Sequence, residues 1–131
     1  LDDALVDGKT IPKSPGQKYK HYAPKARLEV YVGKKVSVKM LDLANRYKDQ
    51  GLRVGILTFE ETIEDFNKYY TLSLGSKDDL STMSHVLFTY LRKMDYKGID
   101  VILAEGVEDI NLGKSIMNRM NKSASGNVYY L

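Results

Sequence analysis

The stretch LEVYVG, residues 28–33, followed by SVKMLDLANRYKDQG, residues 37–51, decides the fold class. The first run is apolar and β-branched and ends in glycine, which predicts a buried strand. In the second run Ser37 is expected to cap a helix at its start, and Gly51 is expected to end it. The apolar residues of this run fall on one helical face, namely Met40, Leu41, Ala44 and Tyr47. A strand followed by a helix is the repeating unit of an α/β domain.

Further strands are predicted along the rest of the chain. RVGILTF (53–59) reads as a second buried strand, and YYTLSLG (69–75) reads as a third. Between them, EETIEDFN (60–67) predicts a short acidic helical turn with a solvated face. IDVILAEGV (99–107) is a nearly continuous apolar strand, and NVYYL (127–131) is a candidate fifth strand.

Two further helices are predicted between these strands. Ser76 and Asp79 stand in capping-box spacing, and Gly98 is expected to end the helix that they open. Its apolar face consists of Met83, Val86, Leu87, Tyr90, Leu91 and Met94. LGKSIMNRMNKSA (112–124) predicts the last helix, whose apolar residues in line are Leu112, Ile116 and Met120.

Strands that alternate with helices imply crossover connections and a mainly parallel sheet covered on both faces. The pattern predicts a Rossmann-like three-layer α/β/α domain with about five strands over residues 28–131. Residues 1–27 are expected to form an irregular basic linker that precedes this domain.

The composition of the chain argues against a metal-binding, a secreted and a membrane-spanning protein. At 131 residues the chain is long enough for one domain with a proper core. It has no cysteine and only two isolated histidines, so no metal site is expected. No apolar run approaches the ~20 residues that span a bilayer, and no signal peptide is evident. We therefore expect a cytoplasmic protein without a membrane partner.

Charge is unevenly distributed along the chain. From Lys9 to Lys39 there are nine basic residues against Glu29 alone, a balance of +8. From Met40 onward eleven basic residues face thirteen acidic ones, a balance of −2. A basic first third indicates a phosphate-bearing partner such as a nucleotide or tRNA, and a solubilising linker is an equally good interpretation.

The carboxyl ends of the predicted strands are candidate ligand sites, because ligands of open parallel sheets gather there. The strongest candidate for a phosphate-binding loop is AEGVEDINLGKS (104–115). In this segment Gly113 and Lys114 open a helix that also carries Arg119. A Walker A loop needs four residues between its first glycine and the Gly-Lys pair, whereas six separate Gly106 from Gly113. An ordinary strand-to-helix turn is the preferred interpretation, with Gly113, Lys114 and Arg119 as a candidate sheet-end loop.

No catalytic constellation is found in the chain. There is no serine, histidine and acid set, no carboxylate pair beside a pocket marker and no GxGxxG. His85 is expected to be a partly exposed helical residue without a role. We therefore predict no catalytic residue here.

The segment SPGQKYKHYAP, residues 14–24, holds two prolines and a glycine, so it can be neither a helix nor a central strand. Its tyrosine and histidine rings can stack on a base, and its lysines can meet phosphates. The alternative is a rigid spacer whose tyrosines dock on the domain surface. The residues alone leave both interpretations open.

Two motifs resemble the two-domain threonylcarbamoyl-AMP synthases. SPGQKYKHYAP (14–24) matches the linker pattern Ser/Ala-Pro-Gly-Met-Lys-Tyr-x-His-Tyr-x-Pro of that family, except that Gln17 replaces methionine. NLGKSIMNRMNKSA (111–124) is similar to the family's tail GLGxAIMNRLxKAA. The resemblance covers the chain from Leu1 to about Ala124.

This resemblance implies a division of labour within a longer protein. In that family an upstream YrdC-like domain condenses threonine, bicarbonate and ATP into threonylcarbamoyl-adenylate and releases pyrophosphate, for threonylcarbamoyladenosine synthesis on tRNA. The parent would then be a nucleotidyltransferase, with ATP and Mg bound by the YrdC-like domain, its partner in cis. The chain would be a non-catalytic accessory domain that binds no cofactor alone.

The resemblance also assigns a role to the linker. In the family this segment folds across the mouth of the catalytic pocket as a lid, and its His-Tyr tyrosine lies near the nucleotide. Matched residue by residue, this tyrosine is Tyr22, with Lys18, Tyr19 and His21 beside it. The rival hypothesis is a nucleotide- or RNA-binding module without catalysis, and a third is autonomous nucleotide hydrolysis.

Overall fold

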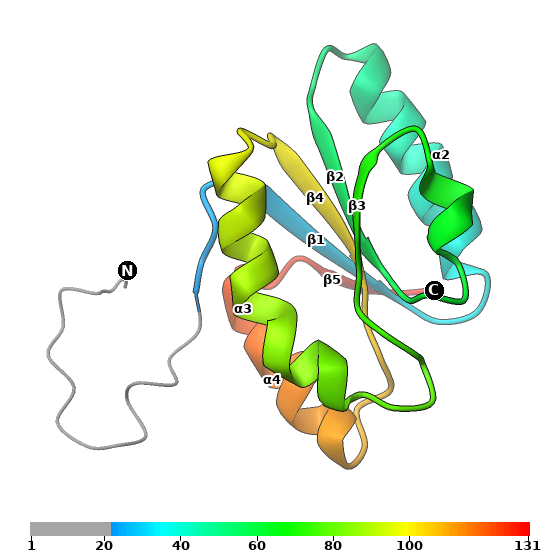
Figure 1. The fold of residues 1–131 in the computed structure, drawn as a ribbon, viewed down its shortest axis with the longest axis vertical. Helices are drawn as coiled ribbons and strands as arrows, with labels where there is room; N and C mark the ends of the chain where they lie inside the picture. Colours follow the sequence, from blue (N-terminus) through cyan, green and yellow to red (C-terminus); the bar gives the residue numbers. More distant parts are fainter. Residues whose placement is uncertain (1–21) are drawn as a thin grey trace, which may run out of the picture.

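The computed structural model describes residues 22–131. This part of the chain forms alternating strands and helices (Figure 1). In chain order the elements are β1 (Arg27–Val32), α2 (Val36–Asp49), β2 (Val54–Thr58), the 3₁₀ helix η2 (Ile63–Phe66), β3 (Tyr70–Ser73), α3 (Ser81–Tyr96), β4 (Val101–Glu105), α4 (Leu112–Ser123) and β5 (Val128–Tyr130). The predicted α/β architecture is confirmed.

The strands form one five-stranded sheet in the order β3-β2-β4-β1-β5, and every neighbouring pair is parallel. In the central pairs Tyr31 lies opposite Glu105, and Leu57 lies opposite Ala104. This register brings the carboxyl ends of β1, β2 and β4 to the same edge of the sheet. The residues that directly follow these three strands are therefore gathered at one edge of the sheet.

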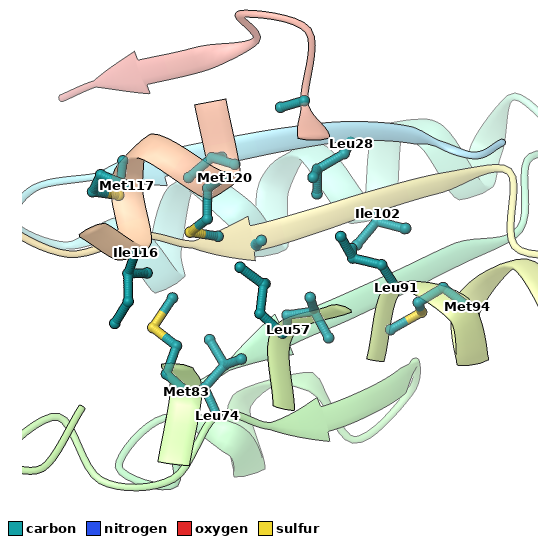
Figure 2. Close-up of a cluster of buried hydrophobic side chains, with 14 of the residues drawn as sticks. Leu28, Leu57, Leu74, Met83, Leu91, Met94, Ile102, Ile116, Met117 and Met120 are labelled. Atoms are coloured by element: carbon teal, nitrogen blue, oxygen red, sulfur yellow. The ribbon is translucent and has the colours of Figure 1, made fainter. Parts of the chain in front are cut away.

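Helices cover both faces of the sheet (Figure 1). Helices α3 and α4 lie together on one face, where apolar side chains of β1, β2 and β4 meet those of both helices (Figure 2). Helix α2 covers the opposite face and contributes Val36, Met40 and Ala44 to a second cluster. Burial on both faces explains why the strands read as continuous apolar runs.

The order of the strands places two neighbouring strands side by side whose following helices lie on opposite faces of the sheet. Strand β1 leads into α2 on one face, whereas its neighbour β4 leads into α4 on the other face. Between two such strands the chain leaves in opposite directions, and a crevice opens at their carboxyl ends.

Helices α2 and α3 end as the sequence predicts but do not begin as it predicts, whereas α4 begins at the predicted Leu112. Gly51 and Gly98 follow α2 and α3 with φ values of +87° and +74°, a conformation that glycine adopts without cost. Ser37, however, lies inside α2, whose N-cap is Lys35 with a φ of 56°. The predicted capping of α2 by Ser37 is therefore wrong.

The start of α3 also differs from the prediction. The helix begins at Ser81, five residues after Ser76; its N-cap residue is Leu80, and the backbone N–H of Ser81 donates to the carboxylate of Asp79. The hydroxyl of Ser76 donates to the carboxylate of Glu61 at 2.9 Å, and the same carboxylate accepts the backbone N–H of Lys77. This anchoring holds the chain outside the helix, so Ser76 and Asp79 form no capping box.

A buried carboxylate lies on the face of the sheet that α2 covers. Glu29 of β1 is only 1% exposed, and it accepts hydrogen bonds from Tyr31 at 2.7 Å and Tyr47 at 2.5 Å. The guanidinium of Arg27 donates to it at 2.6 Å, and Tyr31 stacks on Tyr129 of β5. Every partner comes from the domain itself, so we assign this cluster a structural role.

Candidate functional site

A cavity of about 640 Å³ opens at the carboxyl ends of β1, β2 and β4. Its lining includes Gly33 after β1, Phe59 after β2 and Gly106 after β4, together with the residues that lead into α3 and α4. This is the crevice that the diverging connections of β1 and β4 create. Its volume lies within the ~300–1,000 Å³ that small-molecule sites occupy.

The floor of the cavity carries an ion pair between a buried carboxylate and a half-exposed ammonium group. The carboxylate of Glu105, which is 5% exposed, lies 3.2 Å from the ammonium group of Lys77. Its other oxygen accepts a hydrogen bond of 2.9 Å from the buried hydroxyl of Thr58. Because the ammonium group of Lys77 is about half exposed, the carboxylate of Glu105 bears most of the cost of losing water in this pair.

Two glycines allow the backbone to approach closely around this floor. A Cβ atom at Gly106 would lie 2.8 Å from a methyl group of Val32, and one at Gly113 would lie 2.2 Å from the carbonyl oxygen of Glu108. Both distances are shorter than a methyl group tolerates. The β4–α4 connection therefore keeps its shape because these two positions lack side chains.

The helices that leave this edge begin without side-chain caps. The N-cap of α2 is Lys35, and that of α4 is Asn111 with a φ of 52°; neither makes a side-chain cap hydrogen bond. Lys34 and Asn111 both line the cavity. The first N–H groups of these helices are therefore available to polar atoms at the cavity rim.

The charge of the lining is negative on balance. Two ammonium groups, on Lys34 and Lys77, stand against four carboxylates, on Asp78, Asp79, Glu105 and Glu108. Hydrogen bonds from the hydroxyl and the backbone N–H of Ser81 hold the pKa of Asp79 below its usual range. The cavity thus disfavours a polyphosphate and accepts hydrogen-bond donors.

The three residues predicted for the sheet-end loop have different surroundings. Gly113, the second residue of α4, lines the cavity. The exposed Lys114 is not among the lining residues. Arg119 donates to the carbonyl oxygen of Ser84 at 3.1 Å and to the hydroxyl of Ser115 at 3.2 Å, so it joins α4 to α3.

Tyr22 lies on the surface of α3, away from the cavity. Its hydroxyl donates to Asp95 at 2.6 Å, and the guanidinium of Arg92 lies 5.0 Å from the centre of its ring. Burial, together with the hydrogen bond and the charge of Asp95, raises the pKa of Tyr22 to about 12. Lys18, Tyr19 and His21 lie outside the described residues.

Tyr22 and the cavity occupy opposite ends of α3. Asp95 is in the last turn of this helix, whereas Leu80, at its start, lines the cavity. Fifteen residues at the ~1.5 Å rise of an α-helix separate them by about 22 Å along the axis. Tyr22 is therefore not part of the cavity.

The sequence did not lead us to the ion pair of Glu105 and Lys77 on the cavity floor. It gave neither Glu105 nor Lys77 a role. The available signal was an acidic residue at the end of an apolar strand, directly before Gly106. Its partner Lys77 precedes α3, and only the order of the strands brings the two together.

Within residues 22–131 no group of three or more histidine, cysteine or acidic side chains is placed to hold a metal ion. Among the helices of the same residues, none has the length and apolar character that crossing a bilayer requires.

Residues 2–125 match the family described as threonylcarbamoyl-AMP synthase, C-terminal domain. The threonylcarbamoyl-AMP synthase of Bacillus subtilis is 38% identical over 128 residues, which is 98% of this chain and 36% of the relative. The corresponding protein of Pyrococcus abyssi is 41% identical over 123 residues, 91% of this chain and 34% of the relative. The chain thus spans about a third of the length of these curated relatives.

Solved structures agree with this assignment. A crystal structure of P. abyssi Sua5 complexed with L-threonine superposes with a TM-score of 0.74 at 36% identity, covering 95% of this chain and 36% of that one. A crystal structure of the C-terminal Sua5 domain from Pyrococcus horikoshii superposes with a TM-score of 0.61 at 33% identity, covering 83% of this chain and all of that one. The chain therefore belongs to the family of threonylcarbamoyl-AMP synthase C-terminal domains.

Proposed function

We propose that the chain acts as the accessory C-terminal domain of an L-threonylcarbamoyladenylate synthase. A YrdC-like domain in the same polypeptide would bind ATP with Mg, condense it with threonine and bicarbonate, and release pyrophosphate. The product, threonylcarbamoyl-AMP, serves the synthesis of threonylcarbamoyladenosine on tRNA. The observation that carries this proposal is the family match over residues 2–125, together with relatives about three times as long.

Within this proposal residues 1–27 are the interdomain linker and residues 28–131 are the accessory domain. The backbone N–H groups of Lys25 and Ala26 donate to the carboxylate of Asp95 at 2.9–3.1 Å, directly before β1. Leu28 is the first strand residue in the apolar core. The Asp95 contact therefore marks where the linker meets the domain.

The linker acts as a lid on the ATP site of the YrdC-like domain, and Tyr22 is its nucleotide-contacting tyrosine. In the structure this tyrosine is held on α3 by a hydrogen bond and a cation–π contact, each contributing about 0.5–1.5 kcal/mol at a partly exposed site. Contacts of this strength can exchange for stacking on a base. Lys18, Tyr19 and His21 would supply amines and rings from the same segment.

The substitution Tyr22→Ala in the full-length synthase tests the lid. We expect the KM for ATP to rise roughly tenfold, because the stacking of one ring on a base contributes about 1–3 kcal/mol. The matched control is Tyr96→Ala, which removes a tyrosine of α3 that is 94% exposed and should leave the kinetics unchanged. The measurement is pyrophosphate release as a function of ATP concentration. Unchanged KM and ATP affinity in the Tyr22 variant would contradict the lid role.

A second candidate function is RNA binding by the basic first third of the chain. The balance of +8 between Lys9 and Lys39 favours it. Phosphate contacts release counterions, so affinity for tRNA would fall steeply between two salt concentrations. Absence of tRNA binding at low salt would remove this candidate.

A further inference from the structure

We propose that the cavity at the carboxyl ends of β1, β2 and β4 is a binding site for a ribonucleoside, whose ribose diol donates its two hydroxyl groups to the carboxylate of Glu105. This site lies within the chain itself. It depends neither on the lid nor on the synthase reaction.

The place and size of the cavity favour a ligand of this class. Crevices between parallel strands whose connections diverge are where α/β domains bind nucleosides and related molecules. The volume of about 640 Å³ has room for a base and a sugar together. An amino acid or a single anion would leave most of it empty.

Glu105 is oriented to receive two donors. One oxygen already accepts from Thr58 and the other contacts Lys77, so the plane of the carboxylate is held in place from two sides. A carboxylate has about four lone-pair sites, which leaves one on each oxygen for a ligand. Two adjacent hydroxyl groups match two oxygens of one carboxylate, and such charge-assisted hydrogen bonds are the strong ones.

The walls offer an apolar surface for a base. Phe59 and Leu80 line the cavity on the β2 and α3 side, and Val107 lines it on the β4 side. At the rim Ile110 and Leu112 are 59% and 41% exposed, although both are large apolar side chains. A base resting on them would cover apolar surface that otherwise faces water.

The charges of the lining exclude a ligand that carries several phosphates. Lys77 is already paired with Glu105, and the carboxylates of Asp78, Asp79 and Glu108 remain around the cavity. A triphosphate would meet three like charges, and the second lysine of the lining, Lys34, would be left to oppose them. A neutral nucleoside avoids this repulsion.

Isothermal titration calorimetry on the 131-residue chain, without the YrdC-like domain, tests the proposal. The probes are the four common ribonucleosides, the matched 2′-deoxyribonucleosides, free ribose and ATP. We expect at least one ribonucleoside to bind, and its deoxy counterpart to bind about tenfold or more weakly, because one charge-assisted hydrogen bond is lost. ATP should bind more weakly than the nucleoside.

The variant Glu105→Gln has the same shape but lacks the charge, and it should weaken ribonucleoside binding about tenfold or more. The matched control Glu64→Gln changes an exposed glutamate of η2 and should bind as the unaltered chain does. Amide NMR shifts caused by the nucleoside should concentrate at Gly106, Gly113 and Lys34. The comparison of ribo- and deoxyribonucleosides uses the unaltered chain, so it does not depend on how well the variant folds.

Several results would overturn the proposal. They are no binding of any ribonucleoside, equal affinity for the deoxy form, or undiminished affinity in Glu105→Gln. Ribose binding as tightly as the nucleoside would assign the cavity to a free sugar instead. Since these measurements omit the YrdC-like domain, their failure leaves the lid hypothesis untouched.

Discussion

The side chains around the buried carboxylate of Glu29 determine its protonation state. Burial alone would raise its pKa, but hydrogen bonds from Tyr47, Arg27 and Tyr31 and the charge of Arg27 hold the pKa below its ordinary range. Burial and the hydrogen bond to Glu29 raise the pKa of Tyr31. The fold therefore favours the ionised carboxylate and the neutral phenol.

This arrangement predicts how stability depends on pH. Because the pKa of Glu29 is lower in the folded state, its contribution is present above the unfolded value of about 4.3 and is lost as pH falls through the lower folded value. Tyr47→Phe should cost about 1–3 kcal/mol near neutral pH, and this cost should shrink below about pH 4 as Glu29 becomes protonated. Urea denaturation at several pH values measures both effects.

A matched control for this prediction is Tyr130→Phe, which removes the hydroxyl of an exposed tyrosine and should change the stability little. A cost for Tyr47→Phe that stays constant from neutral to acid pH would contradict the account of Glu29.

Among the elements, helix α3 extends from the cavity to the residues that precede β1. Its start lines the cavity, and its last turn holds Asp95, which accepts hydrogen bonds from Tyr22 and from the backbone of Lys25 and Ala26. The same helix packs its apolar face on the sheet (Figure 2). It is therefore the element that holds the residues directly before β1 in place.

This role of α3 predicts that Asp95→Ala frees the linker. The N–H groups of Lys25 and Ala26 would lose their acceptor, and their hydrogen exchange should accelerate about tenfold or more while the sheet amides stay protected. The control is Asp42→Ala, which removes an exposed i,i+4 pair with Arg46 on α2. Unchanged exchange at both amides in the Asp95 variant would show that this carboxylate does not hold the linker.

Much of the fold could be predicted from the sequence because buried parallel strands leave continuous apolar runs, as in residues 99–107. The starts of α2 and α3 could not be predicted in the same way. Lys35 begins α2 in a left-handed backbone conformation, which no capping side chain indicates. The ion pair of the cavity was harder still to predict, because Glu105 and Lys77 become neighbours only through the order of the strands. Gly113, in the first turn of α4, was singled out because it lies in the connection between an apolar strand and a helix.

At the scale of the whole molecule, the described residues form a domain with its own core on both faces of the sheet, and the family to which it belongs is found in longer proteins. A related domain from P. horikoshii has been crystallised as a chain that this one covers completely. The described residues thus have a core of their own, and we propose that the function of the domain is expressed through a preceding domain and the linker.

The most direct test compares pyrophosphate release from threonine, bicarbonate and ATP by three proteins: the full-length synthase, a version that ends before Leu1, and the 131-residue chain. We expect turnover by the full-length protein, a kcat/KM for ATP reduced about tenfold or more without the linker and accessory domain, and no turnover by the isolated chain. Full activity of the truncated version, or turnover by the isolated chain, would contradict the account.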